Sequence, residues 1–83
     1  MNVEVPLNEL PDEAEAYILS LPHGESGRRL EAMGLRPGKR IRKVYGMPFH
    51  GPITVSLDGR QIAIGHGIST KIKVRPASKE ENG

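Results

Sequence analysis

The segment that most constrains the fold of this chain is Arg28-Arg-Leu-Glu-Ala-Met-Gly-Leu-Arg-Pro-Gly-Lys-Arg-Ile41. It reads as a short helix, a glycine stop, a tight Pro-Gly turn and the start of a strand. Ser26 is predicted to cap the helix N-terminus by accepting backbone N–H bonds. Gly34 suits the position after the helix, where the chain turns left-handed and a Cβ would clash. The apolar contact that accompanies such a stop would then join Leu30 and Leu35.

The rest of the chain is typical of short β-strands. Pro37-Gly38 predicts a turn, after which Lys39 to Tyr45 can run on as a strand. Residues 53–57 alternate strictly, which puts Ile53, Val55 and Leu57 on one face. Asp58-Gly59 is the strongest turn signal in the sequence and predicts a two-residue hairpin. The returning strand would cover residues 61–64.

The remaining segments complete a small β domain. We expect an entry turn at 7–10, a bend at 11–13, a first strand at 14–21, a loop at 46–52, a helical turn or bend at 65–70 and a closing strand at 71–75. Four or five short strands with one helix favour a mainly β fold, a small SH3-like barrel with one short inserted α-helix. The domain would span residues 1–76, and the polar tail 77–83 is expected to be disordered. The predicted core consists of Leu21, Leu30, Leu35, Ile41, Val55, Ile62, Ile64, Ile72 and Val74.

Length and composition exclude several classes of protein. The chain has 83 residues and no cysteine, so disulfides, thiolate metal sites and cysteine nucleophiles are ruled out. Its apolar runs, such as that at 17–19, are far short of the roughly 20 residues that a membrane span needs. The N-terminus lacks the basic-then-apolar pattern of a secretion signal. We therefore expect a soluble, cytoplasmic protein that does not insert into a membrane.

The net charge of +2 conceals an asymmetry along the chain. Residues 1–27 contain six acids and no Lys or Arg, whereas residues 28–76 contain eleven bases and two acids. The simpler interpretation is that the acidic N-terminal part lies against the basic barrel. The alternative is a basic face that meets an acidic or phosphate-bearing partner.

The residues that would carry catalysis or hold a cofactor do not form a recognisable pattern. His23, His50 and His66 are far apart in sequence, and each lies next to a glycine. Zinc and iron sites need three or four converging ligands, so no metal site is predicted. The serines have no evident His/Asp company, and no phosphate-binding loop of the Gly-x-x-x-x-Gly-Lys-Ser/Thr type occurs. We expect neither an enzyme nor a cofactor.

Two features are candidates for binding a partner. The loop tip Met47-Pro-Phe-His50 carries the only phenylalanine, Phe49. This side chain either folds back over the barrel or anchors a partner, with His50 assisting. The second feature is a basic cluster, in which Arg28 and Arg29 stand on the helix while Arg40 and Arg42 share one strand face. The cluster comprises Arg28, Arg29, Arg36, Lys39, Arg40, Arg42 and Lys43.

Several motifs in fixed order resemble the FeoA family, small SH3-like domains that accompany ferrous-iron transporters. The matching pieces are Arg28-Arg29-Leu30 with Met33-Gly34-Leu35, then Pro37-Gly38, Gly51-Pro52-Ile53-Thr-Val55, Asp58-Gly59-Arg-Gln-Ile62-Ala63-Ile64 and Ile72-Lys-Val74. Together they cover roughly residues 7–75. The chain departs from the family pattern at 11–13, where glycine is usual, and at 65–67, where many members have a longer charged helical turn. The family also resembles the C-terminal barrel of iron-dependent repressors, but no helix-turn-helix precedes the barrel here.

The resemblance implies a non-catalytic accessory domain that contacts a membrane iron transporter with a GTP-binding domain. The partner-binding residues would be Met47, Phe49, His50, Arg28, Arg29, Arg40 and Arg42. One alternative is a nucleic-acid-binding barrel that uses the basic cluster from 28 to 43. Another is an SH3 module for proline-rich peptides. Both need aromatic side chains for stacking or for a groove, and the chain has only three. The sequence does not indicate an oligomeric state.

Overall fold

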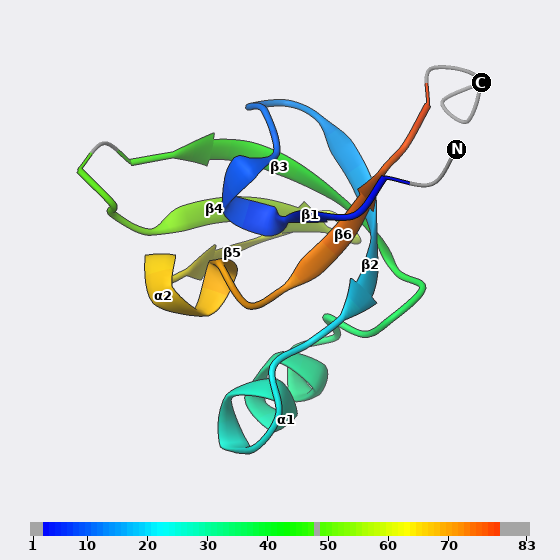
Figure 1. Cartoon of the computed structure of the whole chain (residues 1–83), viewed down its shortest axis with the longest axis vertical. Coiled ribbons are helices and arrows are strands. Elements are labelled where there is room, and N and C mark those ends of the chain that lie inside the picture. The colour runs from blue at the N-terminus through cyan, green and yellow to red at the C-terminus, as the bar shows by residue number, and fades with distance from the viewer. Residues whose placement is uncertain (1–2, 48, 79–83) are drawn as a thin grey trace.

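A single antiparallel sheet of six strands forms the body of the molecule (Figure 1). This computed structural model describes residues 3–47 and 49–78. The elements in chain order are β1 (Val5–Pro6), the 3₁₀ turn η1 (Leu7–Glu9), β2 (Glu15–Ser20), α1 (Glu25–Ala32), β3 (Arg40–Gly46), β4 (Ile53–Leu57), β5 (Arg60–Ile64), α2 (His66–Ser69) and β6 (Lys73–Pro76). The strand order is β1-β6-β2-β3-β4-β5, and the curled sheet is an SH3-like barrel, as predicted.

One short strand goes beyond the expected list. The entry turn at 7–10 is preceded by β1, whose Val5 pairs with Val74 and whose Pro6 pairs with Lys73 of β6. A two-residue strand is too short to leave a periodic pattern in the sequence. The helical turn or bend expected at 65–70 is confirmed as the four-residue helix α2.

Helix α1 ends as predicted but begins differently. Gly34 adopts a left-handed φ of +96°, and the Leu35 N–H donates to the Leu30 carbonyl at 2.9 Å. That bond is the one expected of a glycine-terminated helix, so the stop is confirmed. The prediction that Ser26 caps the helix is wrong. Gly24 is the cap residue, with no side-chain cap bond, and Ser26 lies inside the first turn.

Close packing beneath α1 explains a glycine that the sequence does not single out. A Cβ on Gly27 would lie 2.1 Å from the Pro22 carbonyl oxygen. The first turn of α1 therefore presses directly on the chain leaving β2, and only a residue without a side chain fits there.

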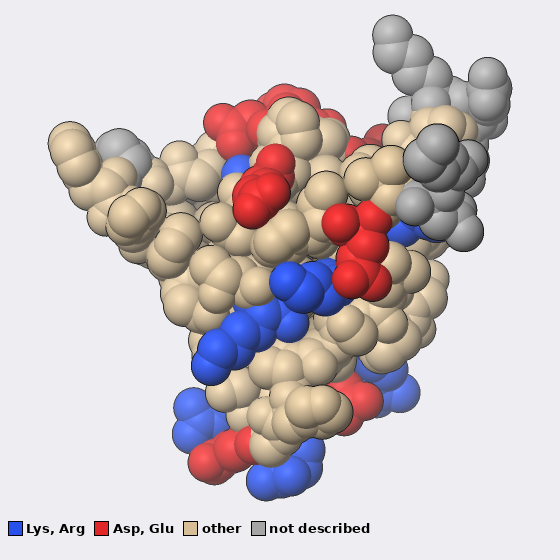
Figure 2. Space-filling model, in the orientation of Figure 1, with Lys and Arg blue, Asp and Glu red and all other residues tan. Residues whose placement is uncertain are grey.

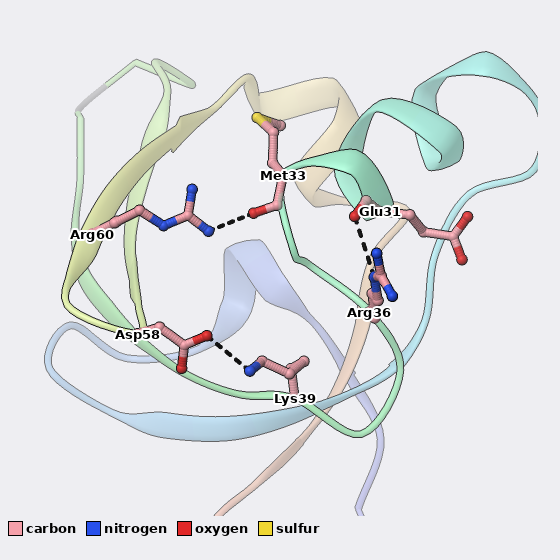
Figure 3. Close-up of polar contacts among 6 residues, drawn as sticks. All are labelled: Glu31, Met33, Arg36, Lys39, Asp58 and Arg60. Atoms are coloured by element: carbon pink, nitrogen blue, oxygen red, sulfur yellow. Dashed lines mark hydrogen bonds and ion pairs between the residues drawn. The ribbon is translucent and has the colours of Figure 1, made fainter.

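The β4–β5 hairpin follows its turn chemistry. Asp58 and Gly59 both have positive φ, +50° and +82°, which is the two-residue turn predicted for Asp-Gly. The hairpin is joined to the segment that follows α1 (Figure 3). Lys39 Nζ lies 2.8 Å from the Asp58 carboxylate, and Arg60 Nη2 donates to the Met33 carbonyl at 2.7 Å.

The core confirms eight of the nine predicted residues. Leu21 is the exception, because it is half-buried at the margin of the core. The register of β2 against β6 shifts between Ile18 and Ser20, and this bulge interrupts the alternation that the prediction assumed. The buried apolar residues that the predicted core omitted are Leu7, Leu10, Ala16 and Ile18 from the N-terminal part, and Ile53 and Leu57 from β4.

At the C-terminal end, the Ala77 N–H donates to the Glu15 carbonyl at 2.9 Å, one residue past β6. Most of the tail expected to be disordered, residues 79–83, lies outside the described residues. No helix in the described part of the chain is long and apolar enough to cross a membrane.

Candidate partner-binding site

The β3–β4 loop carries the most exposed large apolar side chain of the described residues. Phe49 is 98% exposed, and Met47 beside it is 52% exposed. The loop projects from the barrel at a distance from α1 (Figure 1). Of the two alternatives for Phe49, a cover over the core or an outward-facing group, the structure shows the second.

The backbone of the loop holds this orientation. The Met47 N–H donates to the Pro52 carbonyl at 3.1 Å, which closes the loop at its base. Phe49 and His50 both have a φ of +60°, in the left-handed region that non-glycine residues seldom adopt. These two residues therefore turn the chain at the tip, where the Phe49 side chain is exposed.

His50 and His66 meet in space although sixteen positions separate them. Their rings stack with centroids 4.6 Å apart and an interplanar angle of 22°. The two histidines lie beside glycines, as noted from the sequence, and the structure adds this contact between them. Sequence spacing cannot reveal it, because the contact depends on how the β3–β4 loop folds toward α2. Within residues 3–47 and 49–78, no group of three or more His, Asp or Glu side chains could hold a metal ion.

An open pocket of about 440 Å³ lies behind the loop tip. Its lining includes Asn8, Asp12, Lys43, His50 and His66. The pocket is thus bounded by the η1 region on one side and by the histidine pair on the other. Met47 and Phe49 of the loop also line it, so the pocket joins polar walls to the apolar side chains of the tip.

Lys43 is not part of a surface cluster. Lys43 is only 7% exposed, and its Nζ donates to the carbonyls of Leu10 at 2.7 Å and Asn8 at 3.3 Å. The Asp12 carboxylate lies 3.7 Å away. Including Lys43 in the exposed basic cluster was therefore wrong. The alternation of β3 places it on the same inward face as Ile41, and this phase is readable from the sequence.

Arg40 and Arg42 share the outer face of β3, as predicted, and both face carboxylates. Arg40 donates to Glu15 at 2.7 Å, and Arg42 donates to Glu13. The hydrogen bond from Arg40 to Glu15 raises the pKa of the guanidinium. The acidic N-terminal part of the chain therefore lies against the basic strand, which confirms the simpler interpretation of the charge asymmetry.

Tyr17 lies between two cations on this face. The Arg75 guanidinium carbon is 4.8 Å from the centre of the Tyr17 ring, and that of Arg40 is 5.6 Å from it. The Arg40 side chain also donates to the Tyr17 hydroxyl at 3.2 Å. One of the few aromatic side chains is thus engaged within the barrel wall.

Arg28 and Arg29 stand apart from the loop tip and from the outer face of β3. They are exposed on α1, and Arg29 makes a loose pair with Glu25 at 3.5 Å. In the face shown in Figure 2, acidic side chains predominate at the end of the molecule away from α1, a band of Lys and Arg crosses the middle beside further acids, and both kinds are present at the α1 end. The seven predicted site residues therefore fall into three regions: the loop tip, the outer face of β3, and α1.

Known proteins show the same fold and related sequences. A family model described as "FeoA domain" matches residues 5–76. A Methanocaldococcus jannaschii protein that carries the name Fe(2+) transport protein A is 36% identical over 50 residues, which are 60% of this chain and 58% of that protein. The chain thus matches little more than half the length of that relative.

Solved structures agree with this assignment. The crystal structure of an iron uptake regulatory protein, FeoA, superposes with a TM-score of 0.80 and 31% identity, covering 90% of this chain and 99% of the other. A manganese-dependent transcriptional repressor shares the fold, with a TM-score of 0.81 and 18% identity over 93% of this chain and 44% of its own. The family model covers nearly all of the folded domain, and this chain belongs to the FeoA family.

Proposed function

We propose that this protein is a non-catalytic accessory of ferrous iron uptake, which acts in the cytoplasm by contacting a membrane transporter with a GTP-binding domain. Membership of the FeoA family supports this proposal, as do the names of the Methanocaldococcus jannaschii relative and of the iron uptake regulatory protein. The protein would reach the inner membrane through this partner and would not insert into the bilayer itself.

The contact is proposed to centre on the β3–β4 loop. The observation that carries it is the 98% exposure of Phe49 at the tip of a projecting loop. Large aromatic side chains buried at the centre of an interface often supply most of the binding energy. His50, stacked on His66, would support the base of this anchor, and Met47 would extend its apolar surface.

The cations would contribute less affinity than the loop. Arg40 and Arg42 already face Glu15 and Glu13, so the net field of this face is small. Exposed charges at the rim of an interface mainly speed the encounter with an oppositely charged surface. Arg28 and Arg29 lie on α1, away from the loop tip, and would form a separate contact if they take part.

The pairing of basic side chains with carboxylates makes nucleic-acid binding a weaker alternative. Five of the seven bases proposed for that role face a carboxylate: Arg29, Lys39, Arg40, Arg42 and Lys43. Nucleic-acid affinity depends on cations that can neutralise phosphates. A cluster already facing carboxylates has less attraction left for a phosphate backbone.

The test is a binding assay between the purified protein and the purified cytoplasmic GTP-binding domain of the transporter. Phe49→Ala is expected to weaken binding about tenfold or more. Met47→Ala should weaken it less than Phe49→Ala does, and Arg42→Ala should have the smallest effect of the three. Tyr45→Ala is the matched control, because it removes an exposed aromatic side chain outside the loop tip. Circular dichroism should show that all four variants remain folded.

Two results would overturn parts of this proposal. Normal binding by both loop variants, with loss of binding on charge reversal at Arg28 and Arg29, would move the contact to α1. If the protein shows no affinity for the transporter domain and instead retains RNA through purification, the nucleic-acid alternative replaces it.

A further inference from the structure

The strand β5 forms a free edge of the sheet. In the strand order of the described residues, β4 lies on one side of β5 and no strand lies on the other. The hairpin register pairs Leu57 with Arg60 and Val55 with Ile62. In a two-residue hairpin these are the hydrogen-bonded pairs, so the backbone N–H and C=O groups of Gln61 and Ala63 face away from β4.

This edge lacks three features that often prevent pairing with another chain: a proline, a bulge and charges along its length. Five residues long, β5 contains no proline, and its register against β4 has no bulge. Its only charge is at the first residue, Arg60. The other free edge, β1, is only two residues long. An unprotected edge of this length is a template for an added strand.

An apolar groove lies beside the C-terminal end of β5, at Ala63 and Ile64. Its volume is about 180 Å³, and it separates β5 and α2 from α1. Leu30 and Met33 line it from α1, and Ile64 and Ile68 line it from the other side. Because successive side chains of a strand point to opposite faces, a strand added to β5 would project alternate side chains into this groove.

The charges around the groove indicate the chemistry of the occupant. Arg29 is the only charged residue among those lining the groove, and Arg60 stands at the start of β5. The pair between Arg29 and Glu25 is long and exposed, so it offsets little of the positive charge. The region therefore complements an acidic ligand. Two copies of this chain would bring the same arginines together, because a symmetric interface places the same patch on both sides.

We propose that the free edge of β5 binds an extended segment of a partner protein, in which alternate aliphatic residues fill the groove and flanking Asp or Glu residues meet Arg29 and Arg60. Backbone hydrogen bonds from Gln61 and Ala63 would give affinity, and the groove would select aliphatic side chains. This surface is distinct from the β3–β4 loop, and the inference does not depend on the proposed transport function.

The experiment titrates the ¹⁵N-labelled protein with two synthetic heptapeptides. One is acetyl-Asp-Val-Thr-Val-Thr-Val-Asp-amide, and the other replaces both Asp residues with Lys. We expect amide shifts at 61–65 and 26–33 with the acidic peptide. The Lys peptide should bind about tenfold more weakly, because like charges oppose each other at the groove.

Three variants isolate the edge and the charge. Ala63→Pro removes an N–H that faces away from β4, so it should abolish binding. Arg29→Glu should weaken the acidic peptide about tenfold, while Arg28→Glu, the neighbouring exposed arginine outside the groove, should not. Thermal melts by circular dichroism would establish that Ala63→Pro is folded. If Ala63→Pro is unfolded, the comparison of Arg29→Glu with Arg28→Glu still tests the proposal.

Three outcomes would overturn the proposal. They are an absence of shifts at 61–65 at millimolar peptide, equal binding of both peptides, or equal binding by a folded Ala63→Pro protein. Sedimentation that showed a dimer of the protein alone, dissociated by Ala63→Pro, would make a second copy the occupant instead.

Discussion

Arg60 donates a hydrogen bond from Nη2 to the backbone carbonyl of Met33 at 2.7 Å, across twenty-seven positions of sequence. Met33 closes α1, where the last carbonyls have no partner inside the helix. The bond therefore satisfies a helix terminus and joins α1 to the β4–β5 hairpin (Figure 3). Gly34 packs at the same point, since a Cβ there would lie 3.1 Å from Arg60 Nη2.

Removing this link should loosen α1 without disrupting the barrel. Arg60→Ala is expected to lower the free energy of unfolding by about 1 kcal/mol, the net contribution of one such bond. The urea midpoint measures this, and Gln61→Ala, an exposed neighbour on β5, should leave it unchanged. A midpoint equal to that of the parent protein would show that α1 is held by its apolar contacts alone.

Lys43 should be costly to replace even by an apolar side chain of similar length. In Lys43→Met the carbonyls of Leu10 and Asn8 lose their donor, which should lower the free energy of unfolding by about 1–3 kcal/mol. The matched control is Lys71→Met, at an exposed position. If Lys43→Met is as stable as the parent in urea, water replaces the lost donor and the ammonium is dispensable.

Gly27 should tolerate no side chain. The Cβ of Gly27→Ala would overlap the Pro22 carbonyl oxygen, so α1 must shift, and the expected loss of stability is about 1–3 kcal/mol. Gly67→Ala serves as the control, because it places a Cβ in open space within α2. Thermal unfolding of the two variants side by side is the measurement, and equal melting temperatures would contradict the packing described here.

The purified protein should not bind Fe²⁺ or Zn²⁺ with micromolar affinity. The stacked pair of His50 and His66 offers two nitrogen ligands, and a stable site of either metal needs three or four. Anaerobic calorimetric titration is the test for Fe²⁺, and Zn²⁺ can be titrated in air. Tight one-to-one binding that His50→Ala abolishes would show that the loop completes a metal site.

Much of this fold is predictable because it depends on local chemistry. The left-handed turns at Gly34 and at Asp58-Gly59 are properties of a few adjacent residues, so the helix stop and the hairpin were foreseeable. The strict alternation of β4 likewise identified its buried face. The order of these pieces was also sufficient to indicate the family.

The tertiary structure decided the relationships between distant segments. The stacking of His50 on His66 depends on the path of the β3–β4 loop, and the exposure of Phe49 depends on where the same loop carries it. The free edge of β5 exists only because the sheet ends there. Local propensities set the turns and the phase of each strand, whereas contacts across the chain arise from packing that no short window of sequence contains.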